Sequence, residues 1–170
     1  MREVKGNMFD LMLDGETDSI CITTNGIVGA DSKAIMGAGS AGEAARRWPT
    51  VRKTLGKAIK AFGNKPYVIG MINSAGDFQD TDAKLISEKK YQCLIWSLPT
   101  KGDFRRPSQP SLIENSVKLM VEHADKFELK KIVLPRPGCS NGKLEWTEVK
   151  KLIEPILDDR FIIVSFDHEE

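Results

Sequence analysis

The sequence predicts an α/β domain built on a mixed β-sheet. In its second half, short apolar and β-branched runs alternate with amphipathic helical segments, the pattern of strands joined by helical crossovers. In the middle, two extended stretches flank Glu88-Lys89-Lys90, which predicts a β-hairpin and therefore some antiparallel pairing. The chain has 170 residues, 41% of them hydrophobic and 29% charged, so residues 1–170 are expected to form one domain with a substantial core.

The first half should begin with a buried strand at Ser19–Thr24, followed by a Gly/Ala-rich loop and a short helix around Ala41–Trp48. A second helix is expected from an N-cap at Thr50 to a stop at Gly63-Asn64. Its apolar residues recur at helical spacing on one face: Val51, Leu55, Ala58, Ile59 and Phe62. The next strand is expected at Tyr67–Asn73.

The predicted hairpin has the arms Ala83–Ser87 and Tyr91–Leu98, and a Pro-rich loop follows it. Ser111 and Glu114 form a capping-box pattern at the start of a long helix. The remaining elements are a short strand at Lys131–Leu134, a last helix capped by Thr147 and kinked at Pro155, and a strand at Phe161–Phe166.

Composition excludes several classes of protein. A net charge of +1 gives no reason to expect a polynucleotide-coating protein. The first twenty residues lack the apolar run of a signal peptide, and stretches such as Phe161–Val164 are far too short to span a membrane. The three cysteines and two histidines are widely spaced, which argues against a metal site and for reduced thiols. We therefore expect a cytoplasmic protein without metal or cofactor and without membrane contact.

Three loops follow apolar strands: Asn25-Gly26 through Gly39, Thr100-Lys101, and Gly138–Gly142. Ligands of open α/β sheets bind at the carboxyl ends of strands, and glycines there let backbone N–H groups approach phosphate oxygens. Gly37-x-Gly39-x-x-Gly42 also matches the dinucleotide fingerprint. However, the preceding strand ends near Thr24, and no acidic residue lies between Glu43 and Asp77 to bind a ribose. A phosphate cradle remains, whereas a nicotinamide site is excluded.

Each of these signals also has a simpler interpretation. A lysine after a strand is usually solvated, and Asn25-Gly26 is a common turn dipeptide. Cys139 lacks the arginine that a thiol phosphatase needs shortly after its cysteine, so a small buried thiol is the better interpretation. The basic, acid-free segment Arg46–Lys65 is most simply a solvated helix face, and the alternative is a nucleic-acid contact. His123 and His168 are placed on the surface without a role.

Five motifs in order along the chain resemble those of macrodomains. They are GNMF (Gly6–Phe9), ITTNG (Ile22–Gly26), AIMGAG (Ala34–Gly39), SLPTK (Ser97–Lys101) and LPRPGCSNGKLEW (Leu134–Trp146). The resembling branch is that of the ADP-ribosyl hydrolases and ADP-ribose-1''-phosphate phosphatases of bacteria and phages. The resemblance implies a three-layer α/β/α sandwich with a central mixed sheet and an ADP-ribose cleft at its crest.

The same resemblance implies roles for individual residues. Asn7 and Met8 would lie near the adenine, with Asn7 in the place of the family's usual aspartate. Asn25 would face the distal ribose, and Lys101 matches the catalytic lysine of the lysine-dependent hydrolases. Some of those enzymes pair that lysine with an aspartate at the position of Gly142. The two diphosphate loops would consist of Met36, Gly37, Ala38 and Gly39, and of Gly138, Cys139, Ser140, Asn141 and Gly142.

The resemblance implies an enzyme that binds ADP-ribose and hydrolyses an ADP-ribosyl derivative, with Lys101 and Asn25 as catalytic residues. The substrate would be ADP-ribosylated DNA or protein, or ADP-ribose-1''-phosphate. A lysine beside C1'' could stabilise oxyanion charge or attack an opened ribose aldehyde. A non-catalytic ADP-ribose reader is the alternative suggested by Gly142 and the neutral Asn7. A third possibility is a nucleic-acid-binding module that uses Arg46–Lys65.

Overall fold

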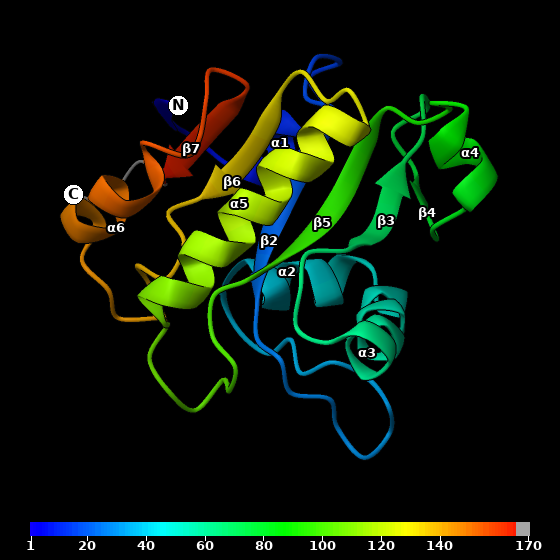
Figure 1. The fold of residues 1–170 in the computed structure, drawn as a ribbon. Coiled ribbons are helices and arrows are strands. Elements are labelled where there is room, and N and C mark those ends of the chain that lie inside the picture. Colours follow the sequence, from blue (N-terminus) through cyan, green and yellow to red (C-terminus); the bar gives the residue numbers. More distant parts are fainter. Residues whose placement is uncertain (166–170) are drawn as a thin grey trace.

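The computed structural model describes residues 1–165 and contains one seven-stranded sheet with strand order β1-β7-β6-β2-β5-β3-β4 (Figure 1). The strands are β1 (Arg2–Lys5), β2 (Ser19–Thr24), β3 (Val68–Ile72), β4 (Phe78–Gln79), β5 (Cys93–Pro99), β6 (Ile132–Pro135) and β7 (Phe161–Ser165). β1, β7, β6, β2 and β5 pair in parallel, whereas β3 is antiparallel to both β5 and β4. The carboxyl ends of the five parallel strands therefore lie at one edge of the sheet.

Helices cover both faces of the sheet, which gives the expected three-layer α/β/α sandwich (Figure 1). The helices are α1 (Met8–Leu11), α2 (Gly39–Arg47), α3 (Thr50–Phe62), α4 (Ala83–Ser87), α5 (Pro110–Lys126) and α6 (Trp146–Ile153). Side chains of α1, α2 and α3 share one buried cluster, and those of α5 and α6 share the other.

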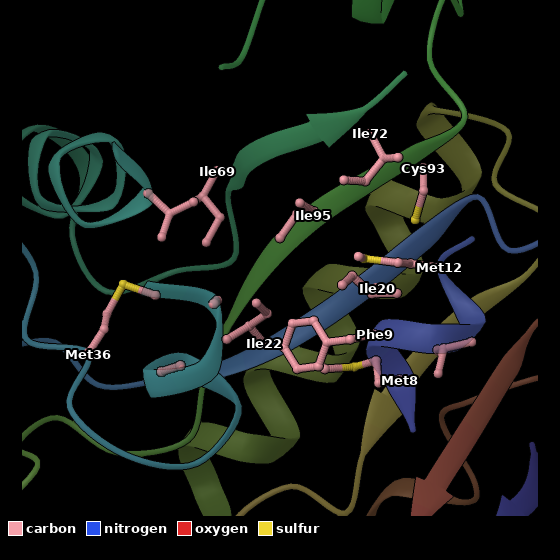
Figure 2. Packing of buried hydrophobic residues seen from close by; sticks show 14 of the residues in the cluster. Met8, Phe9, Met12, Ile20, Ile22, Met36, Ile69, Ile72, Cys93 and Ile95 are labelled. Atoms are coloured by element: carbon pink, nitrogen blue, oxygen red, sulfur yellow. The ribbon is translucent and has the colours of Figure 1, made fainter. Parts of the chain in front are cut away.

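Alternate residues of the central strands enter the two clusters. Ile20 and Ile22 of β2 belong to the cluster beside α1, where Figure 2 shows Met8 and Phe9 close to them. Cys21, between those two isoleucines, belongs to the cluster beside α5. Burial on both faces explains why these strands read as continuous apolar runs instead of alternating patterns.

The predicted hairpin at Glu88-Lys89-Lys90 is wrong. Ala83–Ser87 is the helix α4, because the Asp82 carboxylate accepts hydrogen bonds from the backbone N–H groups of Lys84 and Leu85 and so caps its first turn. The antiparallel hairpin instead joins β3 to the short strand β4. The expectation of a mixed sheet is nevertheless confirmed.

Three predicted helix caps are also wrong. α3 begins at Thr50 itself after Pro49, and the Thr50 hydroxyl donates to Asp80 Oδ1 at 2.7 Å instead of capping. α5 begins at Pro110, before the Ser111 capping box, because the fixed φ of proline suits a first helical position. α6 begins at Trp146 after Glu145, so Thr147 lies inside it. That helix ends at Ile153, and Pro155 therefore follows it without kinking it.

Other boundaries agree with the sequence to within a few residues, but β1, α1 and β4 were not expected. Phe166 and His168 lie outside the described residues. His123 is half-buried and not fully exposed, because its ring packs 4.9 Å from that of Trp96, and this burial lowers its pKa. Within residues 1–165, no helix has the length and apolarity needed to cross a membrane.

Candidate functional site

A cleft of about 1160 Å³ lies at the edge where the five parallel strands end. Its wall contains every site residue predicted from the sequence: Asn7, Met8, Asn25, Met36, Gly37, Ala38, Gly39, Lys101, Gly138, Cys139, Ser140, Asn141 and Gly142. These residues come from five separate motifs. The fold therefore brings together what the sequence spreads over more than a hundred residues.

The strand order sets the sequence of groups along the cleft. Asn7 follows β1, which is the edge strand, and Lys101 follows β5 four strands farther along the sheet. Asn25 follows β2, directly beside β5. The two Gly-rich loops lead into α2 and out of β6, so they lie between the Asn7 end and the Lys101 end.

The Asn25 side chain is buried and held at both ends of its amide. Its Nδ2 donates to the carbonyl oxygen of Ile35 at 2.9 Å, and its Oδ1 accepts from the N–H of Ile27 at 2.9 Å. These bonds fix the amide and fold the loop that leads to Met36. One N–H of the Asn25 amide is left over after these two bonds, and the residue lines the cleft.

The first Gly-rich loop exposes backbone to the cleft. A Cβ on Gly37 would meet no heavy atom within 4 Å, so nothing in the protein itself occupies the space beside it. Gly39 has φ +59° and starts α2, whose N-cap residue Ala38 supplies no side-chain hydrogen bond. The first N–H groups of α2 therefore lack a side-chain cap, as in helix termini that bind phosphate.

The second Gly-rich loop is packed tightly from below. Gly138 has φ +75°, and a Cβ there would lie 2.8 Å from Ile113 Cδ1 and 2.9 Å from Ser108 Cβ. A Cβ on Gly142 would lie 2.2 Å from Ser108 Oγ and 2.5 Å from the carbonyl oxygen of Gly138. Position 142 thus has no room for any side chain. The absence of an aspartate there is imposed by packing against backbone.

Lys101 is held at its backbone and extends toward the second loop. Thr100, the residue before it, is buried, and its N–H donates to the carbonyl of Thr24 at 3.0 Å. Lys101 Nζ donates to the carbonyl oxygen of Asn141 at 3.4 Å. Because β2 lies between β5 and β6, this contact carries the ammonium group past the end of β2, where Asn25 stands.

Asn64 is a site residue that sequence reasoning missed, since it was interpreted only as part of a helix stop. Its Nδ2 donates to the carbonyl oxygen of Lys101 at 3.3 Å. The same nitrogen lies 2.8 Å from where a Cβ on Gly26 would stand, and the Gly26 N–H donates to Gly102 at 3.1 Å. Asn64 therefore supports the segments that carry both Asn25 and Lys101. No local signal in the sequence distinguishes Asn64 from an ordinary residue after a helix stop.

Arg136 and Trp146 were also missed as cleft residues. Trp146 is half-buried and packs against the buried cluster beside α5 and α6, and its Nε1 donates to Glu3 Oε1 at 2.8 Å. The Arg136 guanidinium lies 5.2 Å from the Trp146 ring. Glu3 also accepts from Lys150, and this bond is the main reason that the pKa of Glu3 is lowered. The pair forms the wall near Asn7, at the far end from Lys101.

Two remaining predictions concern Cys139 and metal binding. Cys139 is half-buried, with Sγ 3.4 Å from the carbonyl oxygen of Pro137, so it is more exposed than the buried thiol that was expected. Among residues 1–165, no three His, Cys, Asp or Glu side chains gather as a metal site would require.

Comparisons with known proteins agree on the fold. No protein-family profile matches the chain. It is 29% identical over 154 residues to a DNA ADP-ribosyl transferase-DNA ADP-ribosyl glycohydrolase fusion protein of Thermosipho africanus, covering 88% of this chain and 37% of that protein. It is 27% identical over 158 residues to a DNA ADP-ribosyl glycohydrolase of Thermus aquaticus, covering 93% of this chain and 38% of that protein. The chain thus spans well under half the length of these curated relatives.

Solved structures with the same fold include two DarG macrodomains and a DarTG protein. The Thermosipho africanus DarTG structure in complex with ADP-ribose has a TM-score of 0.75 at 21% identity and covers all of this chain and 43% of its own. The Thermus aquaticus DarG macrodomain has a TM-score of 0.67 at 24% identity, and the match covers 96% of this chain and 95% of that chain. The Mycobacterium tuberculosis DarG macrodomain has a TM-score of 0.68 at 20% identity, and the match covers 96% of this chain and 95% of that chain. The chain has the macrodomain fold that its motifs indicated.

Proposed function

We propose that this chain binds ADP-ribose in the cleft and hydrolyses the bond between its distal ribose and a nucleic acid, with DNA as the substrate. The observation that carries the proposal is Lys101, whose side chain extends along a cleft that also holds two Gly-rich loops and the fixed amide of Asn25. The names of the two curated relatives, both DNA ADP-ribosyl glycohydrolases, support DNA as the carrier of the ADP-ribosyl group.

ADP-ribose would lie along the cleft with its adenine beside Asn7 and its distal ribose beside Asn25 and Lys101. The diphosphate between them would accept hydrogen bonds from backbone N–H groups of the two loops, the arrangement that Gly-rich loops and helix N-termini provide. Asn7 caps α1 through Oδ1, which accepts from the N–H of Phe9 at 2.9 Å. A carbonyl oxygen has a second lone pair, so Asn7 can still accept from the adenine amine.

Lys101 would act at C1'' of the distal ribose. Its ammonium group can stabilise the negative charge that develops on the departing base while water attacks C1''. Alternatively, after losing a proton, the amine attacks C1'' and displaces the base, the ring opens to an imine between C1'' and Lys101, and water hydrolyses that imine. In either route the bond from C1'' to the base breaks, and water finally supplies the hydroxyl at C1'' and the proton on the base. No acid at position 142 can assist, because a side chain there would collide with Ser108 and Gly138.

A non-catalytic ADP-ribose reader is the second candidate function, and the side-chain-free position 142 is the observation in its favour. It uses the same cleft and differs only in turnover. Hydrolysis of ADP-ribosylated protein or of ADP-ribose-1''-phosphate remains a variant of the enzymatic proposal. We also propose that residues 1–170 act as one domain and that the protein works in the cytoplasm, where thiols such as those of the buried Cys21 and Cys93 would stay reduced.

The Lys101→Ala variant tests the proposal. We expect it to lose turnover by roughly a hundredfold or more, equivalent to about 3 kcal/mol of activation free energy. Its affinity for free ADP-ribose should stay within a few-fold, because other residues hold the adenine and the diphosphate. The measurements are release of ADP-ribose from ADP-ribosylated DNA and protein, release of phosphate from ADP-ribose-1''-phosphate, and calorimetry with ADP-ribose.

Lys118→Ala is the matched control, since Lys118 is an exposed lysine on α5 that pairs with Glu114 outside the cleft. It should behave as wild type. If Lys101→Ala turns over as fast as wild type, Lys101 has no catalytic role, and Asn25 with a bound water becomes the better candidate. If wild type binds ADP-ribose but cleaves none of the three substrates, the reader function is correct. If ADP-ribose does not bind at all, the proposed function is wrong.

A further inference from the structure

We infer that the loop after β5 is a docking surface for the nucleic-acid strand that carries the ADP-ribosyl group. Phe104 would stack on a base next to the modified nucleotide, and Arg106 would contact a backbone phosphate. This inference rests on the proposed function and adds a second contact at the rim of the cleft, beyond the residues that would hold ADP-ribose itself.

The position of Phe104 is the first argument. The loop follows β5, the last parallel strand, so it closes the Lys101 end of the cleft, and Phe104 is part of the cleft wall. In Figure 1 this green loop lies at the same edge as the blue loop that follows β2. A group attached at C1'' of a distal ribose beside Lys101 would leave the cleft at this end. The nucleic-acid strand would therefore leave the cleft within reach of the loop that carries Phe104.

The second argument is that Phe104 is an exposed aromatic ring on an ordered loop. It is 46% exposed, one of three large apolar side chains exposed in residues 1–165. The Asp103 carboxylate accepts from the backbone N–H and the Nε of Arg105, each at 2.9 Å, and the Asp103 carbonyl accepts from the N–H of Arg106 at 3.1 Å. The Arg105 guanidinium lies 5.5 Å from the Phe104 ring. The ring is thus supported by its own loop, although water contacts nearly half of it.

The third argument is charge. The Arg105 guanidinium is neutralised by Asp103, whose pKa it holds down at about 2, so this acid stays ionised near neutral pH. Arg106 is exposed and forms no ion pair with any residue of the described chain. An exposed guanidinium two residues from an exposed aromatic ring, in the loop that begins at Lys101, fits a polyanion whose bases have flat faces. Proteins that bind single strands combine these two features.

The basic segment Arg46–Lys65 is the competing surface. Four of its seven basic side chains make ion pairs or hydrogen bonds, and Lys53, Lys57 and Lys65 are exposed. Arg46 and Arg47 both pair with Glu43, and Arg52 donates to the carbonyl oxygen of Ala34 at 3.0 Å. Lys60 donates to Ser32 Oγ at 2.8 Å. Lys53 remains exposed on α3 and does not line the cleft. A charge reversal at Lys53 therefore tests whether the strand follows this face instead.

The experiment compares binding of a fluorescently labelled, ADP-ribosylated single-stranded DNA oligonucleotide with binding of free ADP-ribose. All variants carry Lys101→Ala in addition, and a gel confirms that the oligonucleotide stays intact. The protein with Lys101→Ala alone is the parent, and we expect it to bind the oligonucleotide more tightly than it binds free ADP-ribose. Phe104→Ala should weaken oligonucleotide binding about tenfold to a hundredfold. It should leave the affinity for free ADP-ribose within twofold, and Phe104→Trp should retain both.

Arg106→Glu should also weaken oligonucleotide binding and should reduce the slope of log affinity against log salt by about one. The matched controls are Lys53→Glu for charge and Leu13→Ala for exposed apolar surface, because Leu13 is 53% exposed in the turn before β2, at the other end of the sheet. Neither control should change oligonucleotide binding.

Three results would overturn the inference: equal affinity of the parent for the oligonucleotide and ADP-ribose, no loss in Phe104→Ala and Arg106→Glu, or a loss only in Lys53→Glu. Each leaves the proposed hydrolase intact, since ADP-ribose binding is measured separately. If the parent does not bind ADP-ribose, the proposed function fails instead. The loop is then judged with the unmodified oligonucleotide, where a loss in Phe104→Ala supports the docking surface and equal binding excludes it.

Discussion

Glycines at three positions of the cleft are required for different physical reasons. Gly138 has a positive φ and no space for a Cβ, and Gly142 lies against Ser108 and a backbone carbonyl, so both serve the packing of the protein. Gly37 has neither constraint, because nothing lies within 4 Å of its Cβ position and its φ is not positive. Neither the backbone conformation nor the packing of the protein requires a glycine at this position. A glycine of this kind in the wall of a cleft indicates that a ligand approaches its backbone.

This difference predicts opposite effects of two similar substitutions. Gly37→Val should leave the melting temperature nearly unchanged, because the valine side chain enters open space. It should weaken ADP-ribose binding by roughly tenfold or more, because the same side chain blocks the approach of the diphosphate to the backbone. Gly138→Val should lower the melting temperature by several degrees, because its side chain is forced into Ile113 and Ser108. Thermal unfolding and calorimetry measure the two effects. Full ADP-ribose affinity in a folded Gly37→Val protein would show that this loop does not hold the diphosphate.

At the scale of elements, the turn between α3 and β3 supports the catalytic end of the cleft. Asn64 in this turn bonds to the backbone of Lys101 and contacts Gly26, so one side chain connects three elements that are far apart in sequence. Asn64 does not line the cleft. Its effect on the proposed reaction would therefore be one of positioning.

We predict that Asn64→Ala lowers kcat about tenfold, as expected for a small displacement of a catalytic group, while the Kd for ADP-ribose stays within twofold. A merely structural role would lower stability without this split between kcat and binding. Kinetics on ADP-ribosylated DNA, calorimetry and thermal unfolding together decide the point.

Gly26→Ala alone should destabilise the protein, because its Cβ would lie 2.8 Å from Asn64 Nδ2. In combination with Asn64→Ala, the same substitution should destabilise the protein less. Strictly additive effects would contradict the proposed contact.

At the scale of the whole molecule, Asp14 ties the turn before β2 to the start of β6. Burial raises the pKa of its carboxyl group, but hydrogen bonds from the N–H groups of Thr17 and Glu16 and from Lys131 outweigh burial and lower the pKa from 3.8 to about 2. A carboxyl group whose pKa is lower in the folded state stabilises the protein when ionised. This stabilisation is complete above a pH of about 4 and is lost as the pH falls through about 2.

We predict that Asp14→Asn unfolds more easily than wild type at neutral pH, by about 1–2 kcal/mol after allowing for the partial exposure of this carboxylate. The difference should shrink as the pH falls from about 4 toward 2. Urea unfolding followed by fluorescence at a series of pH values measures it. A difference that stays constant over this range would mean that the ionised Asp14 does not provide the stabilisation.

The elements with strong local signals were the ones that could be predicted. Helices cover the sheet on both sides, so β2 and β5 are apolar on both faces. The sequence shows this pattern as the continuous apolar runs Ile20–Ile22 and Leu94–Trp96. The stop of α3 at Gly63 follows from local backbone preference. The hairpin at Glu88 failed because Asp82, a helix cap, was a stronger local signal than the β-branched residues near it.

The residues alone predicted three loops at strand ends, and the resemblance to macrodomains named thirteen residues, which the structure places on one cleft wall. Turn chemistry at strand ends is local, and the carboxyl ends of parallel strands meet at one edge. The roles given to these residues remain predictions, which the experiments on Lys101 and Gly37 address.

The sequence by itself thus determined the class of fold and the loops of the cleft, and its resemblance to macrodomains indicated the lysine that should act in it. Only the tertiary structure showed that Asn64 supports Lys101, that Ser108 and Gly138 leave no room for a side chain at Gly142, and that Phe104 stands exposed at the Lys101 end. The physical reason is that hydrophobic periodicity and turn preferences act between residues near in sequence. Contacts such as these depend on the strand order β1-β7-β6-β2-β5-β3-β4, which brings distant segments together and which no local pattern encodes.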